Sequence, residues 1–158
     1  MKLHTNFARA NGSKNTAQYL LARGFGLWAL VAAPVYAALE DDVVGRWKLV
    51  SHLVTFDGQT FDSHQALLQQ RPCAADIVYE TNRDKTYRLN AAASSCDEKY
   101  KKMQEKLYAK TQWKLDGATL TTSATHFAVG QSYTVSVAGK QMVWVGKDGQ
   151  GTLTYQRQ

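Results

Sequence analysis

Three histidines follow residue 37, and they are the side chains of this sequence best suited to metal binding or acid–base chemistry: His52, His64 and His126. Such sites need fixed spacings, for example the paired histidines of an HExxH helix or the serine of a Gly-x-Ser-x-Gly turn. The sequence contains neither pattern. It therefore predicts no metal site, no cofactor and no catalytic residues. Catalysis would require His52 or His126 to point inward beside an acid.

The carboxylates and glycines also lack the patterns of an enzyme. Asp41-Asp42 and Asp97-Glu98 lie in a terminal segment and at an expected helix start, where solvation or helix capping explains acidic residues. The glycines cluster in expected hairpins, and none forms a phosphate-binding loop. The sequence thus predicts a protein without catalytic activity of its own.

Aromatic and aliphatic side chains near the middles of expected strands are the candidates for contact with a small molecule. Tyrosines are well suited, because the hydroxyl can orient a mostly apolar ligand while the ring supplies contact area. The candidates are Ile77, Tyr79, Tyr87, Leu89, Trp113, Tyr133 and Val135. The alternative for each of them is core packing, since alternation cannot distinguish a filled interior from a hollow one.

Short segments of alternating polarity, separated by turn residues, must position these side chains. The clearest runs over residues 107–115 with a period of two, followed by Asp116-Gly117 and a threonine-rich segment. Dipeptides of this kind tolerate the positive φ of a tight hairpin. The expected strands are 43–56, 75–82, 85–90, 107–115, 118–126, 131–137, 140–146 and 152–157.

Two stretches depart from this pattern. Ser95 and Glu98 form a capping-box spacing that predicts a short helix, with Tyr100, Met103 and Leu107 at helical spacing. Acidic residues are interleaved with its lysines, which favours a solvated face over contact with an anionic partner; the lysines are Lys99, Lys101, Lys102 and Lys106. Residues 57–72 are less regular, and we expect either a lid over the end of a barrel or a plain surface loop.

Eight sequential strands without crossover helices predict an all-β fold, an eight-stranded antiparallel up-and-down barrel with one short helix. A barrel of this size has room for side chains or for one small ligand. The architecture therefore favours a binding protein, and a filled barrel is the alternative.

Basic charge is concentrated at the N-terminus. The chain has 158 residues and a formal net charge of +6, but residues 1–37 hold four of its 19 basic residues and none of its 13 acidic ones. The remainder carries only +2, which gives no reason to expect nucleic-acid binding. Residues 24–33 form an uncharged apolar run, followed by Val35-Tyr36-Ala37, a small-residue cleavage site. We predict a signal peptide over 1–37 and a mature domain over 38–158.

The apolar run is too short for a membrane anchor. Ten helical residues rise about 15 Å, roughly half of a hydrocarbon core. No other apolar run is long enough to span a bilayer. The sequence thus predicts a periplasmic or secreted protein with no membrane span.

Cys73 and Cys96 are the only cysteines, and both lie in the predicted mature domain. In an oxidising compartment they can pair in only one way within the chain, which predicts a structural disulfide. The alternative, a reactive or metal-binding pair, lacks a CxxC spacing and a nearby histidine.

The segment from Val44 to Val50, VGRWKLV, resembles the Gly-x-Trp opening of the first strand in lipocalins. Residues 39–158 resemble the small bacterial lipocalin-like domain more closely, in which a cysteine-flanked hairpin follows that opening. The segment from Trp113 to Leu120, WKLDGATL, is similar to that domain's central element. The resemblance implies a lipocalin-like barrel that binds a small molecule.

The resemblance also implies structural roles for Gly45, Trp47 and Arg157, because the family often places a basic residue over the tryptophan. The chemistry of these residues, taken without the resemblance, predicts the same structural roles. An indole at the start of the first strand can close one end of a barrel, and Arg157 can stack on its ring. Contact with ligand is the alternative role for both.

These observations predict an exported, lipocalin-like barrel that binds a small, largely apolar molecule. The alternative is an extracytoplasmic protein-interaction or inhibitor module, in which a solid barrel acts through its loops, residues 57–72 above all. A protein partner would then take the place of the small molecule.

Overall fold

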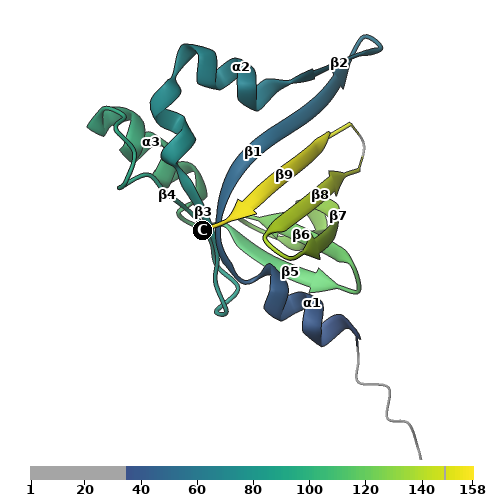
Figure 1. The fold of residues 1–158 in the computed structure, drawn as a ribbon. Helices are drawn as coiled ribbons and strands as arrows, with labels where there is room; N and C mark the ends of the chain where they lie inside the picture. Colours follow the sequence, from purple (N-terminus) through teal and green to yellow (C-terminus); the bar gives the residue numbers. More distant parts are fainter. Residues whose placement is uncertain (1–34, 148) are drawn as a thin grey trace, which may run out of the picture. The chain divides into compact units, whose positions relative to one another are not determined.

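Antiparallel strands follow one another along most of the chain in the computed structural model, which describes residues 35–147 and 149–158 (Figure 1). The predicted signal peptide lies outside the described residues, except for the backbone of 35–37, which begins helix α1 (Val35–Val43). The strands are β1 (Gly45–Phe56), β2 (Gln59–Asp62), β3 (Val78–Thr81), β4 (Tyr87–Asn90), β5 (Gln112–Asp116), β6 (Thr119–Ser123), β7 (Gln131–Ala138), β8 (Gln141–Gly146) and β9 (Thr152–Arg157). The other helical elements are α2 (Ser63–Gln70), α3 (Glu98–Tyr108), and the short 3₁₀ turns η1 (Pro72–Asp76) and η2 (Phe127–Val129).

Eight of these strands form a nearly closed antiparallel barrel, in the order β4-β3-β1-β9-β8-β7-β6-β5. A bridge between Thr86 and Gln112 joins the two ends of this order. Two backbone hydrogen bonds support it: the Tyr87 amide donates to the Thr111 carbonyl (3.0 Å) and the Trp113 amide to the Lys85 carbonyl (2.8 Å). The predicted all-β barrel is thereby confirmed, and closure leaves few unpaired edges.

Residues 57–72 are more regular than predicted. Asp57 and Gly58, at φ 50° and 73°, form a two-residue hairpin turn, and β2 then pairs with the outer half of β1. Helix α2 follows at once, begun by Asp62, which caps its first turn. The segment is therefore a hairpin arm and a helix, and not a loop.

The helix expected near residue 98 begins and ends later than predicted. Its N-cap is Asp97, whose carboxylate accepts from the Tyr100 amide, and not Ser95. Helix α3 continues to Tyr108, so the strand predicted over 107–115 begins only at Gln112. The alternation at 107–111 was misleading, because Tyr100, Gln104 and Tyr108 recur every fourth residue and form the inner face of the helix.

One end of the barrel is closed by α1 and the start of β1. Trp47 is fully buried, and its Nε1 donates to the Val43 carbonyl at 3.0 Å. The Arg157 guanidinium lies 4.3 Å from the Trp47 ring and donates to the carbonyl oxygens of Asp42 and Val44. A Cβ on Gly45 would lie 2.7 Å from Arg157 Nη1, so glycine makes room for this contact. The predicted stacking of Arg157 on Trp47 is confirmed.

Aromatic rings fill the middle of the barrel. Trp144 contacts Tyr87, Tyr133 and Tyr155, with ring centroids 5.1–5.6 Å apart. All four side chains are at most 7% exposed. The ring planes are tilted against one another by 41–55°, and contacts between aromatic rings add to the stability that burial alone provides.

Candidate functional site

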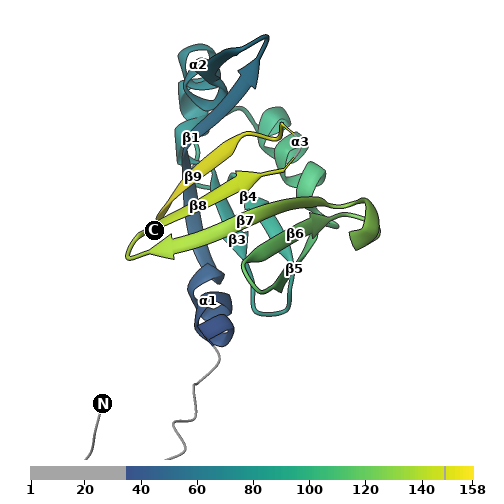
Figure 2. The ribbon, with the colours of Figure 1, turned by 90° about the vertical axis from the view of Figure 1, so that its right-hand side faces the viewer.

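A cavity of about 190 Å³ lies at the end of the barrel opposite α1. Because neighbouring strands are antiparallel, the connections that carry α2, α3, η2 and the β8–β9 turn all lie at this end, which we call the mouth (Figure 2). The cavity is partly open to solvent and is bordered by β1, α2, η1, β3 and α3. Its lining residues are Leu49, His52, Ser63, His64, Leu67, Ala74, Ile77, Tyr79, Tyr100 and Gln104.

Asp62 positions the polar side of this cavity. Its Oδ1 accepts from the amides of His64 (2.9 Å) and Gln65 (3.0 Å), which begins α2, and from the His52 amide of β1 (3.1 Å). Partial burial alone would raise the pKa of Asp62, but hydrogen bonds from Ser51 and from these amides hold it below its usual value. One ionised carboxylate thus joins the strand to the helix.

The His52 ring is held on both sides. Its Nε2 lies 3.1 Å from the Gln150 carbonyl oxygen, which can only accept, so Nε2 carries a proton. In the neutral ring Nδ1 then accepts from Ser63 Oγ at 3.0 Å. The ring therefore links β1, α2 and the β8–β9 turn at the edge of the cavity.

Gly151 allows the β8–β9 turn to approach His52 closely. Its φ is 77°, and a Cβ there would lie 2.2 Å from the Leu53 carbonyl oxygen. Only glycine fits this position without a shift of the backbone. A larger residue would move the neighbouring Gln150 carbonyl away from the His52 ring.

His64 is 7% exposed and lies beside the cavity. Burial lowers its pKa, although the nearby Asp62 carboxylate and a hydrogen bond with the Leu49 backbone act in the opposite direction. The ring is therefore neutral at neutral pH. A neutral imidazole suits an uncharged ligand that forms hydrogen bonds.

Tyr79 in the wall of the cavity keeps its hydroxyl proton. Desolvation raises the pKa of Tyr79 well above its usual value, and the neighbouring Tyr108 and Tyr100 add to this effect. Tyr79 also joins the cavity to the aromatic interior, since its ring stacks on Tyr87 at a centroid distance of 6.1 Å. The wall of the cavity thus offers a neutral hydroxyl next to apolar surface.

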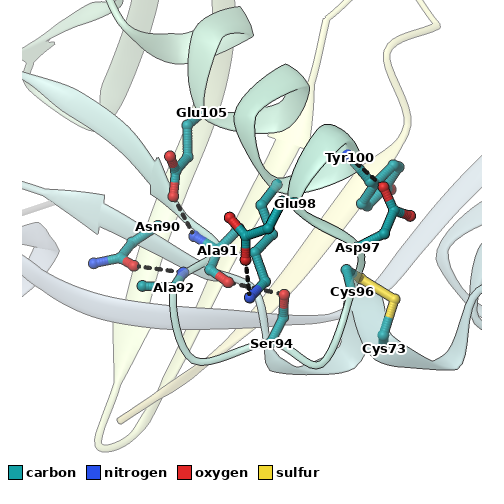
Figure 3. A network of polar contacts seen from close by, with 11 residues as sticks. Cys73, Asn90, Ala91, Ala92, Ser94, Cys96, Asp97, Glu98, Tyr100 and Glu105 are labelled. Carbon is teal, nitrogen blue, oxygen red and sulfur yellow. Dashed lines mark hydrogen bonds and ion pairs between the residues drawn. A yellow bond between two sulfur atoms is a disulfide. The ribbon is translucent and has the colours of Figure 1, made fainter.

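A disulfide fixes the two elements that form the far wall. Cys73 in η1 is bonded to Cys96, which lies just before α3 (Figure 3). Ala74 and Ile77 contribute the apolar surface on one side of this bond, and Tyr100 contributes a ring on the other. The predicted disulfide is confirmed, and it joins elements that line the cavity.

Polar contacts hold α3 on the preceding loop. Glu105 accepts from the Ala91 amide at 3.2 Å, and Ser94 Oγ donates to the Ala91 carbonyl at 2.8 Å (Figure 3). The Arg71 guanidinium lies 4.0 Å from the Tyr100 ring centroid and pairs with Asp97 at 3.3 Å. These contacts set the position of the cavity wall formed by α3.

The seven candidate ligand residues fall into separate parts of the barrel. Ile77 and Tyr79 line the cavity at the mouth. Leu89 is buried in a small cluster with Ile77 below that cavity. The others belong to the main core: Tyr87, Trp113, Tyr133 and Val135. Trp113 is fully buried, and its Nε1 donates to the Asn82 carbonyl at 3.1 Å, near the closed end.

Sequence reasoning missed most of the polar lining, above all Ser63 and its contact with His52. The missed lining lies largely on α2, within the stretch for which the sequence predicts either a lid or a surface loop. A signal was present: Asp62 and Gln65 have the spacing of an N-cap and its third helical residue. A lone strand histidine such as His52 carries no such signal, because its partners come from residues 63 and 150.

No family model, curated protein or solved structure matches this chain. In the part of the chain that the structure describes, no helix is long and apolar enough to cross a membrane. Within those same residues, no group of three or more His, Cys, Asp or Glu side chains is arranged to hold a metal ion.

Proposed function

We propose that this protein is an extracytoplasmic, lipocalin-like carrier that binds one small, largely apolar molecule at the mouth of the barrel. The observation that carries the proposal is the cavity itself, with apolar side chains on one side and hydrogen-bonding groups on the other. Cavities of about 150 Å³ are known to hold benzene. The cavity of about 190 Å³ therefore suits a ligand of one ring with one polar substituent.

The contact between Ser63 and His52 supports binding better than catalysis. The distance of 3.0 Å between Ser63 Oγ and His52 Nδ1 is one that a serine nucleophile and its histidine base would have. Acyl transfer also needs donors for an oxyanion, and the nearby amides of His64 and Gln65 already donate to Asp62. Ser63 Oγ also lies 3.1 Å from the His52 carbonyl oxygen, a second acceptor for its proton. The pair thus serves to position α2 and to present polar atoms to a ligand.

The disulfide supports a location outside the cytoplasm, because such bonds persist in oxidising compartments. The predicted signal peptide agrees with a periplasmic or secreted protein.

Filling the cavity tests the proposal. Ala74 is 5% exposed and lines the cavity, whereas Ala93 is exposed in the loop before α3. We expect Ala74→Leu to weaken the binding of single-ring probes such as phenol and indole at least tenfold, and Ala93→Leu to leave it unchanged. Titration calorimetry with the disulfide-bonded protein measures both. Equal binding of the probes by the two variants, both folded, would refute the site.

Two observations favour the alternative of a protein-interaction module. Aromatic side chains fill the middle of the barrel, as the solid barrel of this alternative requires. Phe56 and Phe61 lie on the β1–β2 arm and are 78% and 49% exposed. Exposed aromatic side chains of this kind are typical of interaction surfaces. Replacing both with serine would abolish capture of a protein partner under this alternative and leave probe binding intact under the proposal above.

A further inference from the structure

The outer face of α3 combines positive charge with apolar side chains. Lys99, Lys102 and Lys106 are exposed and follow one another at spacings of three and four residues. Met103 and Leu107 lie among them and are 49% and 64% exposed. We call these five residues the outer face of α3. It contains no acidic side chain.

The acidic side chains of α3 have other partners. Glu105 accepts from the Ala91 amide, and Glu98 pairs with Lys101 at 3.1 Å (Figure 3). Among the ion pairs of the described residues, none involves the three lysines of the outer face. The three lysines of the outer face therefore form no ion pair among the described residues, and they make this face rich in positive charge.

A shallow hollow of about 280 Å³ lies beside this face. It is lined by Arg71, Asp97, Lys99, Tyr100 and Met103. Arg71 is held in place by the Tyr100 ring and by Asp97, 3.3 Å away, which neutralises part of its charge. Lys99 supplies a second cation, and Met103 supplies an apolar wall. The hollow thus combines the features that would contact a phosphate and the start of a hydrocarbon chain.

The most exposed apolar side chains of the described residues lie at the same end of the barrel. Phe56, Val129 and Leu107 are 78%, 77% and 64% exposed, and all belong to connections at the mouth. Among the side chains that the structure describes, those of residues 38–147 and 149–158, the closed end presents no exposed large apolar one. The most exposed large apolar side chains are therefore found at the end of the barrel that also carries the lysines of α3.

We propose that the outer face of α3 docks the protein on an anionic lipid bilayer, with the mouth of the barrel toward the membrane. The lysines contact headgroup phosphates, while their stems and the side chains of Met103 and Leu107 enter the interface. A soluble polyanion would use the lysines but would leave the apolar side chains in water. This is why the observations favour a bilayer. The inference does not depend on ligand binding in the cavity.

Vesicle sedimentation tests the proposal with the full chain. Phosphatidylcholine vesicles with and without phosphatidylglycerol are the probes. We expect Lys102→Glu/Lys106→Glu to lower partitioning onto the anionic vesicles at least about tenfold, because each basic residue near the surface contributes to the attraction. Met103→Ser/Leu107→Ser should also lower it. Every variant carries the same residues 1–34, so a difference between variants comes from the substituted side chains.

Lys140→Glu is the control, since this lysine is exposed in the β7–β8 turn at the closed end. It should retain most of the binding. The single variant Lys106→Glu changes the charge by the same amount as this control. The proposal is overturned if these two single variants reduce binding equally, or if Met103→Ser/Leu107→Ser binds as the unmodified chain does. Binding to soluble polyphosphate without binding to anionic vesicles would also overturn it, in favour of a soluble anionic partner.

Discussion

The two ends of the barrel are stabilised in different ways. At the closed end, Trp47 has no exposed surface, and its only polar atom donates to a backbone carbonyl. At the mouth, helices cover the opening, and a disulfide and the contacts of His52 hold them in place. The closed end is held by the burial of an indole together with the hydrogen bonds of Trp47 and Arg157, whereas the mouth depends on a covalent bond and on the contacts of His52. The difference shows how a barrel can keep a stable core at one end and a cavity at the other.

The largest expected effect is at the closed end. Trp47→Ala removes a fully buried indole and should lower the free energy of unfolding by about 3–5 kcal/mol. Urea unfolding followed by circular dichroism measures the loss. Trp47→Phe keeps most of the buried area and should cost less. A loss below about 1 kcal/mol for the alanine variant would show that this end does not depend on burial.

Removing the disulfide tests how far the stability of the mouth depends on this bond. Cys73→Ser/Cys96→Ser should lower the free energy of unfolding by about 3 kcal/mol, because the bond closes a loop with a sequence separation of 23. Hydrogen exchange should rise in α3 and η1 and stay unchanged around Trp47. If hydrogen exchange became faster around Trp47 as well, the two ends would not be stabilised independently.

The smallest expected effect is the pH dependence of the cavity. Burial lowers the pKa of His64 below its model-peptide value of 6.5, so the unfolded chain takes up this proton more readily than the folded one. The stability that neutral His64 contributes is present above pH 6.5 and is lost as the pH falls through the lower pKa of the folded state. The affinity of the cavity for the single-ring probes should fall over the same pH range.

His64→Gln is the control for that titration, since glutamine keeps hydrogen-bonding capacity without a charge. Unfolding and probe binding, measured between about pH 7.5 and 5, should depend less on pH in this variant. An unchanged pH dependence would assign the effect to another group.

The closed end was more predictable than the mouth. Trp47 and Arg157 lie on the first and last strands, and antiparallel closure of the barrel brings these strands together. The disulfide followed from having only two cysteines. At the mouth, the alternation at 107–111 imitated a strand, although Tyr108 completes the inner face of α3. The contact of His52 with Ser63 and Gln150 joins residues 11 and 98 positions apart, which no local pattern reveals.

By itself the sequence determined the class of fold, most strand positions, the tight hairpins and the disulfide, because these depend on local alternation, turn chemistry and a single possible pairing. Only the tertiary structure decided which candidate side chains pack in the core and which face a cavity. It also decided that Lys99, Lys102 and Lys106 form no ion pair among the described residues, while Lys101 pairs with Glu98. Both outcomes depend on the packing of segments distant in sequence, since a residue's surroundings are set by the neighbours that the fold brings to it.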